Sequence, residues 1–185
     1  MRYPFHCLRA RRVLARGGVI AYPTEGVWGL GCDPFNKRAV ERLLDLKDRP
    51  WQKGLIVALA NEVVAMALLR TLPQDRQKAI SATWPGPHTW LLPHNGLWPS
   101  WVTGESDFIA CRLSAYPVVC DLALASGGAI ISTSANPAGQ APAMTAQEVR
   151  QYFGRSVDFI MPGGVQGLQK TSAIRHGTTG ETLRE

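Results

Sequence analysis

Short runs built almost entirely of apolar residues recur along this chain, and stretches with apolar residues at every third or fourth position separate them. A run such as 55–59 has no polar face, so a strand formed there must be covered on both sides. Strands of this kind that alternate with helices are typical of a mixed α/β sheet covered by helices. The predicted strands span residues 19–22, 55–59, 89–92, 108–112, 129–133 and 157–161, with a short C-terminal pairing around 172–175.

Helical spacing and helix-end signals place the helices. Residues 4–16 have the pattern of a basic amphipathic helix, which the glycines at 17 and 18 end. Thr145 followed by Glu148 is a capping box, in which each side chain bonds to the other residue's backbone N–H, and it opens a helix that runs to residue 153. The other predicted helices span 36–47, 61–70, 74–83 and 117–125, and residues 24–31, which contain three glycines, are predicted as a loop.

Length and composition fit one domain with a substantial core, covering residues 1–185. Of the 185 residues, 45% are hydrophobic, and 20 Lys and Arg against 14 Asp and Glu give a formal charge of +6. A basic chain favours an acidic partner such as a nucleotide, a phosphorylated substrate or RNA. A generally basic surface explains the same charge equally well.

The spacing of cysteines and histidines offers no zinc motif, because there is no C-x-x-C and no H-E-x-x-H. We therefore predict no metal ligands in the chain, and free thiols that are buried or half-buried. No apolar run approaches the roughly 20 residues of a spanning helix, and the N-terminus lacks the apolar core and cleavage site of a signal peptide. These features predict a cytoplasmic protein with no membrane attachment.

Neither of the two commonest phosphate-binding motifs occurs, since the chain has no G-x-x-x-x-G-K-[ST] and no G-x-G-x-x-G after its first strand. Lys47 and Arg49 lie at the end of the predicted helix, which Pro50 prevents from continuing. Pro50 also stiffens the turn, so that the planar Arg49 guanidinium can be aimed at phosphate oxygens. A cation pair at a helix end is explained as well by the helix dipole, and spacing alone does not separate the two interpretations.

Two further candidates follow predicted strands: Arg112 ends one, and the hydroxyl-rich run 132–136 ends another. Ligands usually bind at the carboxyl ends of strands in an open sheet, because the loops diverge there. The hydroxyl run has a second interpretation, a turn that satisfies its own backbone. Thr24 and Glu25, after the first strand, are likewise either site residues or a strand exit with a solvated Glu25.

Together these segments resemble the YrdC/TsaC family of threonylcarbamoyl-AMP synthases, which make the activated intermediate for N6-threonylcarbamoyladenosine in tRNA. The resemblance covers nearly the whole chain and rests on the order and spacing of several motifs. These are Tyr22-Pro23-Thr24-Glu25 with Gly29-Leu30-Gly31, Leu46-Lys47-Asp48-Arg49-Pro50, Lys53-Gly54-Leu55-Ile56, Trp84-Pro85-Gly86-Pro87, Ala110 to Leu113, and Ser132 to Asn136.

The resemblance implies a twisted mixed sheet flanked by helices around a large concave basic cleft. It also implies a reaction in which L-threonine and bicarbonate combine to an N-carboxylate that attacks the α-phosphorus of ATP, with Mg²⁺ accompanying the nucleotide. Implied partners are the TsaD, TsaB and TsaE proteins, and binding of tRNA is a further expectation. The resemblance assigns catalysis to Lys47 and Arg49, and substrate binding to Thr24, Arg112, Ser132, Ser134 and Asn136.

The main alternative is a pure RNA-binding module, because a charge of +6 and a basic cleft also suit structured RNA. That alternative predicts strongly salt-dependent RNA binding and no ATP turnover. A synthase predicts an adenylate formed from ATP, threonine and bicarbonate.

Overall fold

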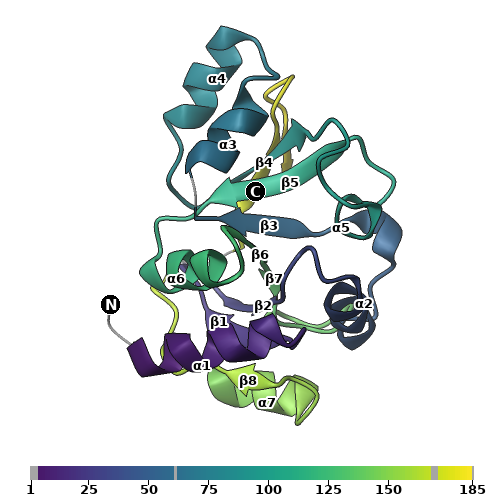
Figure 1. Cartoon of the computed structure of the whole chain (residues 1–185), viewed down its shortest axis with the longest axis vertical. Helices are drawn as coiled ribbons and strands as arrows, with labels where there is room; N and C mark the ends of the chain where they lie inside the picture. The colour runs from purple at the N-terminus through teal and green to yellow at the C-terminus, as the bar shows by residue number, and fades with distance from the viewer. Residues whose placement is uncertain (1–3, 61, 168–170, 185) are drawn as a thin grey trace.

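The computed structural model describes residues 4–60, 62–167 and 171–184, which form two β-sheets with helices around them (Figure 1). The strands are β1 (Ile20–Pro23), β2 (Trp28–Gly31), β3 (Ile56–Leu59), β4 (His88–Pro93), β5 (Phe108–Leu113), β6 (Ala129–Ile131), β7 (Thr133–Ser134), β8 (Phe159–Ile160), β9 (Ala173–His176) and β10 (Thr182–Arg184). The helices are α1 (Pro4–Ala15), α2 (Lys37–Leu46), α3 (Glu62–Leu69), α4 (Gln74–Ser81), α5 (Ser100–Thr103), α6 (Pro117–Ala125) and α7 (Ala146–Phe153), with a 3₁₀ turn η1 (Trp51–Lys53).

Both sheets are mixed, as predicted. In the described part of the chain one sheet has the strand order β7-β2-β1-β8 and the other has the order β10-β9-β4-β5-β3-β6. β1 pairs with β8, β3 with β5 and β4 with β9 in parallel, whereas the remaining neighbours are antiparallel. The predicted C-terminal pairing is confirmed, because β9 lies between β4 and β10.

The predicted strand 129–133 is divided between the two sheets, which corrects the expectation of one sheet. β6 pairs with β3, and β7 pairs with β2 in the other sheet. The chain changes sheets at Ser132, whose backbone N–H donates to the carbonyl oxygen of Ile56 at 2.8 Å, while the N–H of Ile131 donates to Cys32 at 3.0 Å. The hydroxyl-rich run 132–136 therefore lies at the junction of the sheets.

The prediction of a loop over 24–31 is wrong for its second half, where β2 begins at Trp28. In β2, Gly31 allows two backbone segments to approach closely and does not form a turn. A Cβ at Gly31 would collide with the carbonyl oxygen of Ile131, so only glycine lets β2 lie against the sheet junction. The sequence pattern does not distinguish these two uses of glycine.

The predicted helices are confirmed to within a few residues at each end, although the short helix α5 was not predicted. Residue 61, where one predicted helix began, lies outside the described residues. The cysteines are free thiols, buried at Cys32 and Cys111 and half-buried at Cys7 and Cys120, as predicted. None of the helices in the described ranges combines the length and apolar character that crossing a bilayer demands.

Two apolar cores hold the layers together. The larger core contains residues of both sheets, and the smaller lies under α1 and α6. α2 begins at its N-cap Asn36, whose Oδ1 accepts from the backbone N–H of Ala39 at 3.1 Å, and it buries an apolar face that includes Val40 and Leu43. Lys47 is the C-cap of α2. The packing of α2 in the core therefore fixes the backbone position from which the Lys47 side chain extends.

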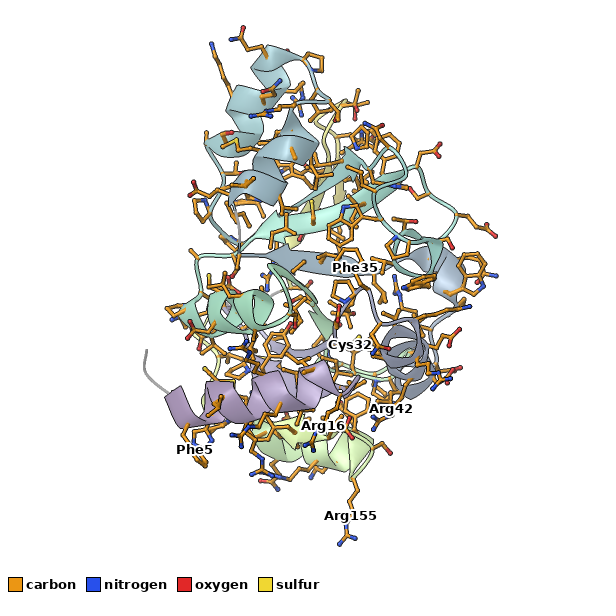
Figure 2. All side chains as sticks on the ribbon, viewed as in Figure 1. Phe5, Arg16, Cys32, Phe35, Arg42 and Arg155 are labelled. Atoms are coloured by element: carbon orange, nitrogen blue, oxygen red, sulfur yellow. The ribbon has the colours of Figure 1, made fainter. Side chains whose placement is uncertain are left out.

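Asp158, just before β8, connects three segments of the chain. Its Oδ2 accepts from the backbone N–H of Val19 at 2.8 Å, and its two carboxylate oxygens accept from the guanidinium of Arg42 at 2.6 and 3.1 Å. Arg42, labelled in Figure 2, also donates to the carbonyl oxygen of Ser156 at 2.5 Å. Partial burial raises the pKa of Asp158, but the bonds from Arg42 and Val19 outweigh it, so the pKa lies below its ordinary value.

The substitution Asp158→Asn should lower the free energy of unfolding by about 1 kcal/mol at neutral pH, because a partly exposed ion pair is lost. A carboxylate with a lowered folded-state pKa stabilises the fold above its unfolded pKa of about 3.9, and loses that contribution as pH falls through the folded value. Urea unfolding of both proteins across this range would measure the difference.

The control is Asp107→Asn, which removes an exposed carboxylate just before β5 that belongs to no helix. It should leave the unfolding free energy unchanged at every pH. A destabilisation by Asp158→Asn that persists in strong acid would show that the carboxylate charge is not its cause.

Candidate functional site

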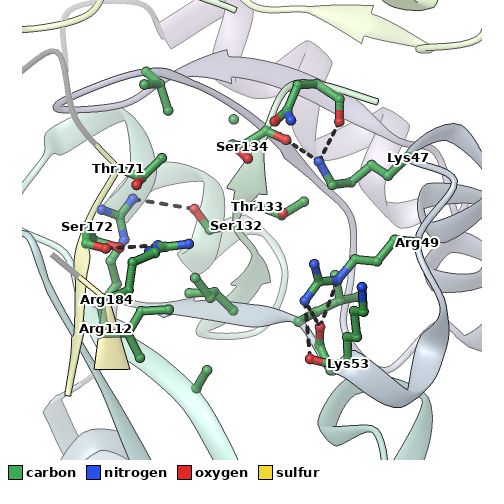
Figure 3. A pocket seen from close by; sticks show the side chains of 18 of the residues that line it. Lys47, Arg49, Lys53, Arg112, Ser132, Thr133, Ser134, Thr171, Ser172 and Arg184 are labelled. Carbon is green, nitrogen blue, oxygen red and sulfur yellow. Dashed lines mark hydrogen bonds between the residues drawn. The ribbon is translucent and has the colours of Figure 1, made fainter. Parts of the chain in front are cut away.

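A cleft of about 830 Å³ lies where loops of both sheets meet (Figure 3). Its wall is assembled from the β1–β2 turn, the end of α2, η1, β5, the sheet junction and the C-terminal strands. The structure brings together in this one cleft every residue that the sequence analysis proposed for the site: Thr24, Lys47, Arg49, Arg112, Ser132, Ser134 and Asn136.

Lys47 connects the end of α2 to the sheet junction. Its Nζ donates to the backbone carbonyl oxygens of Ser134 at 2.5 Å and Asn136 at 2.7 Å (Figure 3). These acceptors belong to another segment and not to α2, so the helix dipole alone does not explain the position of the ammonium. Burial, with a smaller contribution from the charge of Arg49, lowers the pKa of Lys47 to about 8.

Arg49 follows a sharp turn at Asp48, whose φ of 49° lies in the left-handed region. Its Nε and Nη2 donate to the carbonyl oxygen of Gly54 at 3.1 and 2.8 Å, and Nη2 also donates to that of Lys53 at 3.2 Å. Burial lowers the pKa of this guanidinium. The carbonyl oxygens at the end of the η1 turn thus hold Arg49 against the cleft wall.

Arg112 and Glu25 form a buried ion pair on the other side of the cleft. The Nη1 of Arg112 lies 3.2 Å from Oε2 of Glu25, and the two side chains are 7% and 10% exposed. Ser114 Oγ donates to Oε1 of Glu25 at 2.9 Å, and Arg112 Nη2 donates to Ser132 Oγ at 3.4 Å. The interpretation of Glu25 as a solvated strand exit is therefore wrong, because the turn folds back and the buried guanidinium needs a counter-charge.

The hydroxyl-rich run both forms a turn and lines the cleft. The Nδ2 of Asn136 donates to the carbonyl oxygens of Pro137 at 3.1 Å and Gln140 at 2.8 Å, as the turn interpretation predicted. Its Oδ1 is buried and has no hydrogen-bond partner within the described ranges. Ser134 contributes its carbonyl oxygen to Lys47, so the turn also fixes the cation.

Thr24 closes the turn between β1 and β2. Both its backbone N–H and its Oγ1 donate to the carbonyl oxygen of Val27, at 3.2 and 2.7 Å. The side chain is buried, and a Cβ at Gly29 would lie 3.2 Å from its Cγ2. Thr24 therefore sets the shape of the turn that carries Glu25 into the cleft.

Several groups on the cleft wall were not predicted from the sequence. Lys53 and Arg184 add to its positive charge, and the Arg184 Nη2 donates to the carbonyl oxygen of Ser172 at 2.8 Å (Figure 3). Partial burial of its guanidinium, and then the charge of Arg49, lower the pKa of Arg184. Arg184 stands on a short exposed strand and belongs to no sequence motif, so no local signal pointed to it.

The arrangement suits a polyanion. Among the described lining residues the cations Lys47, Arg49, Lys53, Arg112 and Arg184 face only the carboxylates Glu25 and Asp48. Hydroxyl groups and the free Asn136 Oδ1 supply uncharged contacts. Across residues 4–60, 62–167 and 171–184, no three His, Cys, Asp or Glu side chains gather as metal ligands.

Comparison with known proteins agrees in fold and in family. A threonylcarbamoyl-AMP synthase of Hahella chejuensis is 51% identical over 177 residues, covering 96% of each chain, and one of Halorhodospira halophila is 48% identical over 181 residues, covering 98% of this chain and 95% of its own. The crystal structure of P. abyssi Sua5 complexed with L-threonine matches 92% of this chain with a TM-score of 0.84 and 29% identity, and this chain spans 50% of that longer one. The family model Sua5_yciO_yrdC, described as telomere recombination, matches residues 12–185. The chain therefore belongs to the Sua5/YciO/YrdC family.

Proposed function

We propose that this protein is a threonylcarbamoyl-AMP synthase, which joins L-threonine, bicarbonate and ATP and releases pyrophosphate. The observation that carries the proposal is the convergence, in one cleft, of cations and hydroxyls from separate segments of the chain. Relatives with this name are about half identical along nearly the full length. The related Sua5 of P. abyssi is titled as a complex with L-threonine.

The proposed reaction requires alignment and charge neutralisation, with no covalent enzyme intermediate. The amine of threonine bonds to the carbon of bicarbonate, water leaves, and the resulting N-carboxylate attacks the α-phosphorus of ATP through one of its oxygens. The bond from the α-phosphorus to the bridging oxygen breaks, and pyrophosphate leaves with the electron pair. Negative charge moves onto the leaving phosphates. Cations that are fixed beside those phosphates stabilise this charge and so accelerate the step.

The two walls of the cleft have different parts in this proposal. Lys47 and Arg49, fixed by backbone carbonyls, would face the triphosphate, with Arg112 as a further cation. Ser132, Ser134 and Asn136 would contact phosphate and ribose oxygens. The turn that contains Thr24 would face threonine, because it closes the same cleft from the side of β1 and β2.

Mg²⁺ would enter as part of the substrate, bound to the triphosphate. Glu25 is already paired with Arg112, which leaves Asp48 as the other carboxylate among the described lining residues. The residues present therefore fit an ion carried mainly by phosphate and water, as is usual for magnesium.

The expected compartment is the cytoplasm. TsaD, TsaB and TsaE are the proposed users of the product, a mixed anhydride that is prone to hydrolysis.

Incubation with ATP, L-threonine and bicarbonate, followed by mass spectrometry, tests the function directly. The proposal requires an adenylate that contains threonine and depends on bicarbonate. Tight RNA binding with no adenylate would instead favour the RNA-binding module.

Replacing Arg49 with Ala should reduce pyrophosphate release that depends on threonine and bicarbonate by about 100-fold or more, because a fixed donor to the phosphates is lost. Circular dichroism should remain unchanged. The exposed Arg70 offers a matched control, since Arg70→Ala removes the same charge outside the cleft and should leave turnover intact. Normal turnover of the Arg49 variant would remove this residue from the site.

Lys47 should set an upper pH limit on the use of ATP. Burial lowers its pKa to about 8, so the free enzyme has the ammonium below that pH and loses it as pH rises. Because kcat/KM reports ionisations of the free enzyme, its value for ATP should be level below about pH 8 and fall above it. Lys47→Arg, which stays charged, should abolish this fall even if its overall activity is lower. An identical falling limb in both enzymes would assign the titration to another group.

Glu25→Gln should destabilise the protein by roughly 3–5 kcal/mol, because it leaves the Arg112 guanidinium buried without a counter-charge. Urea unfolding would measure this loss. The double variant Glu25→Gln, Arg112→Gln should recover part of it, since no lone charge remains buried. Strictly additive losses would contradict an energetic coupling between the two side chains.

A further inference from the structure

One side of α1 presents arginines and apolar side chains to solvent. Its other side packs into the smaller core through Ala10 and Leu14. Figure 2 labels Phe5 near the start of this helix and Arg16 just after its end. We call the outward side the arginine face, and its exposed residues are Phe5, Leu8, Arg9, Arg11, Arg12 and Arg16.

The positive charge of the arginine face is not neutralised within the described protein. α1 contains no acidic residue, and the ion pairs among the described residues lie elsewhere, between Lys37 and Glu41, Arg42 and Asp158, and Arg112 and Glu25. Arg9 and Arg12 are three positions apart in α1, which sets them in one stripe with a step of about 4.5 Å along the axis, and Arg16 follows directly after the helix. Like charges at this spacing repel one another, so a partner with negative charge would relieve a standing cost.

Apolar side chains on the same face decide what kind of partner fits. Phe5 is 73% exposed and Leu8 is 46% exposed, and the Arg9 guanidinium lies 5.0 Å from the centre of the Phe159 ring. Aromatic residues and arginine are the side chains enriched at protein interfaces. A phosphate backbone would leave Phe5 and Leu8 uncovered. A helix binds a lipid surface through an apolar side that is exposed. The apolar side of α1 is already buried in the core.

We propose that the arginine face of α1 is a docking surface for an acidic protein segment whose apolar side chains are flanked by carboxylates. The arginines would pair with the carboxylates, while Phe5 and Leu8 bury against the apolar residues. None of the residues of this face lines the cleft. The proposal therefore stands apart from the proposed function, and binding and turnover can be measured separately.

The test uses a fluorescein-labelled helical peptide that carries leucines and glutamates on one side, with fluorescence anisotropy as the readout. The wild-type protein should bind it, and binding should weaken as salt rises. Arg12→Glu with Arg16→Glu should raise Kd at least tenfold, and the milder pair Arg12→Gln with Arg16→Gln should raise it less. Phe5→Ala with Leu8→Ala should also raise Kd although the charge is unchanged. Pyrophosphate release should stay the same in all of these variants.

A control with the same change of charge comes from the opposite end of the molecule, where α3 and α4 lie (Figure 1). Arg70→Glu with Lys78→Glu alters exposed residues there and should leave Kd unchanged. Equal weakening by both charge-reversing pairs, or no binding of the peptide at all, would overturn the proposal. Duplex RNA or phosphatidylglycerol vesicles that bind through Arg12 and Arg16 more tightly than the peptide does would overturn it as well.

Discussion

The contact between the Lys47 ammonium and the carbonyl oxygens of Ser134 and Asn136 fixes the geometry on which the cleft depends. It joins the end of α2 to the place where the chain leaves one sheet and enters the other. α2 is held by its buried apolar face, and the junction is held by backbone pairing on both sides. A single cation therefore links two rigid parts of the fold, and the hydroxyls of the run 132–136 take their positions from that link.

Positive charge is stabilised differently on the two walls of the cleft. Lys47 and Arg49 are bonded to neutral backbone carbonyls, which orient their donors but leave their charge uncancelled. Arg112 instead has Glu25 as an ionic partner. The excess of positive field is consequently concentrated on the side of α2 and η1, and the opposite wall is closer to electrical balance. A ligand with one strongly anionic end and one zwitterionic end matches that division.

Local periodicity was sufficient to place most helices and strands, because each was stabilised by a capping residue or an apolar face that can be read within a few positions. Thr145 and Glu148 form the predicted capping box, and Asn36 caps α2. Long-range features were less accessible. Gly31 looked like a loop residue since its purpose, approach to the carbonyl of Ile131, involves a partner 100 positions away in the chain.

The candidate site shows the same difference between local features, which the sequence reveals, and long-range features, which it does not. The backbone positions of Lys47 and Arg49 were predictable because a helix end and a proline set them locally. The acceptors that hold the Lys47 ammonium, the burial of Glu25 and the position of Arg184 depend instead on which segments fold over the cleft. The lowered pKa values of Lys47, Arg49 and Arg184 have burial as their first cause, so the free protein holds these charges at an energetic cost. A polyanion that enters the cleft removes part of that cost. The same burial that weakens the isolated cations thus strengthens their differential attraction for phosphate, and it acts most strongly where charge accumulates during transfer.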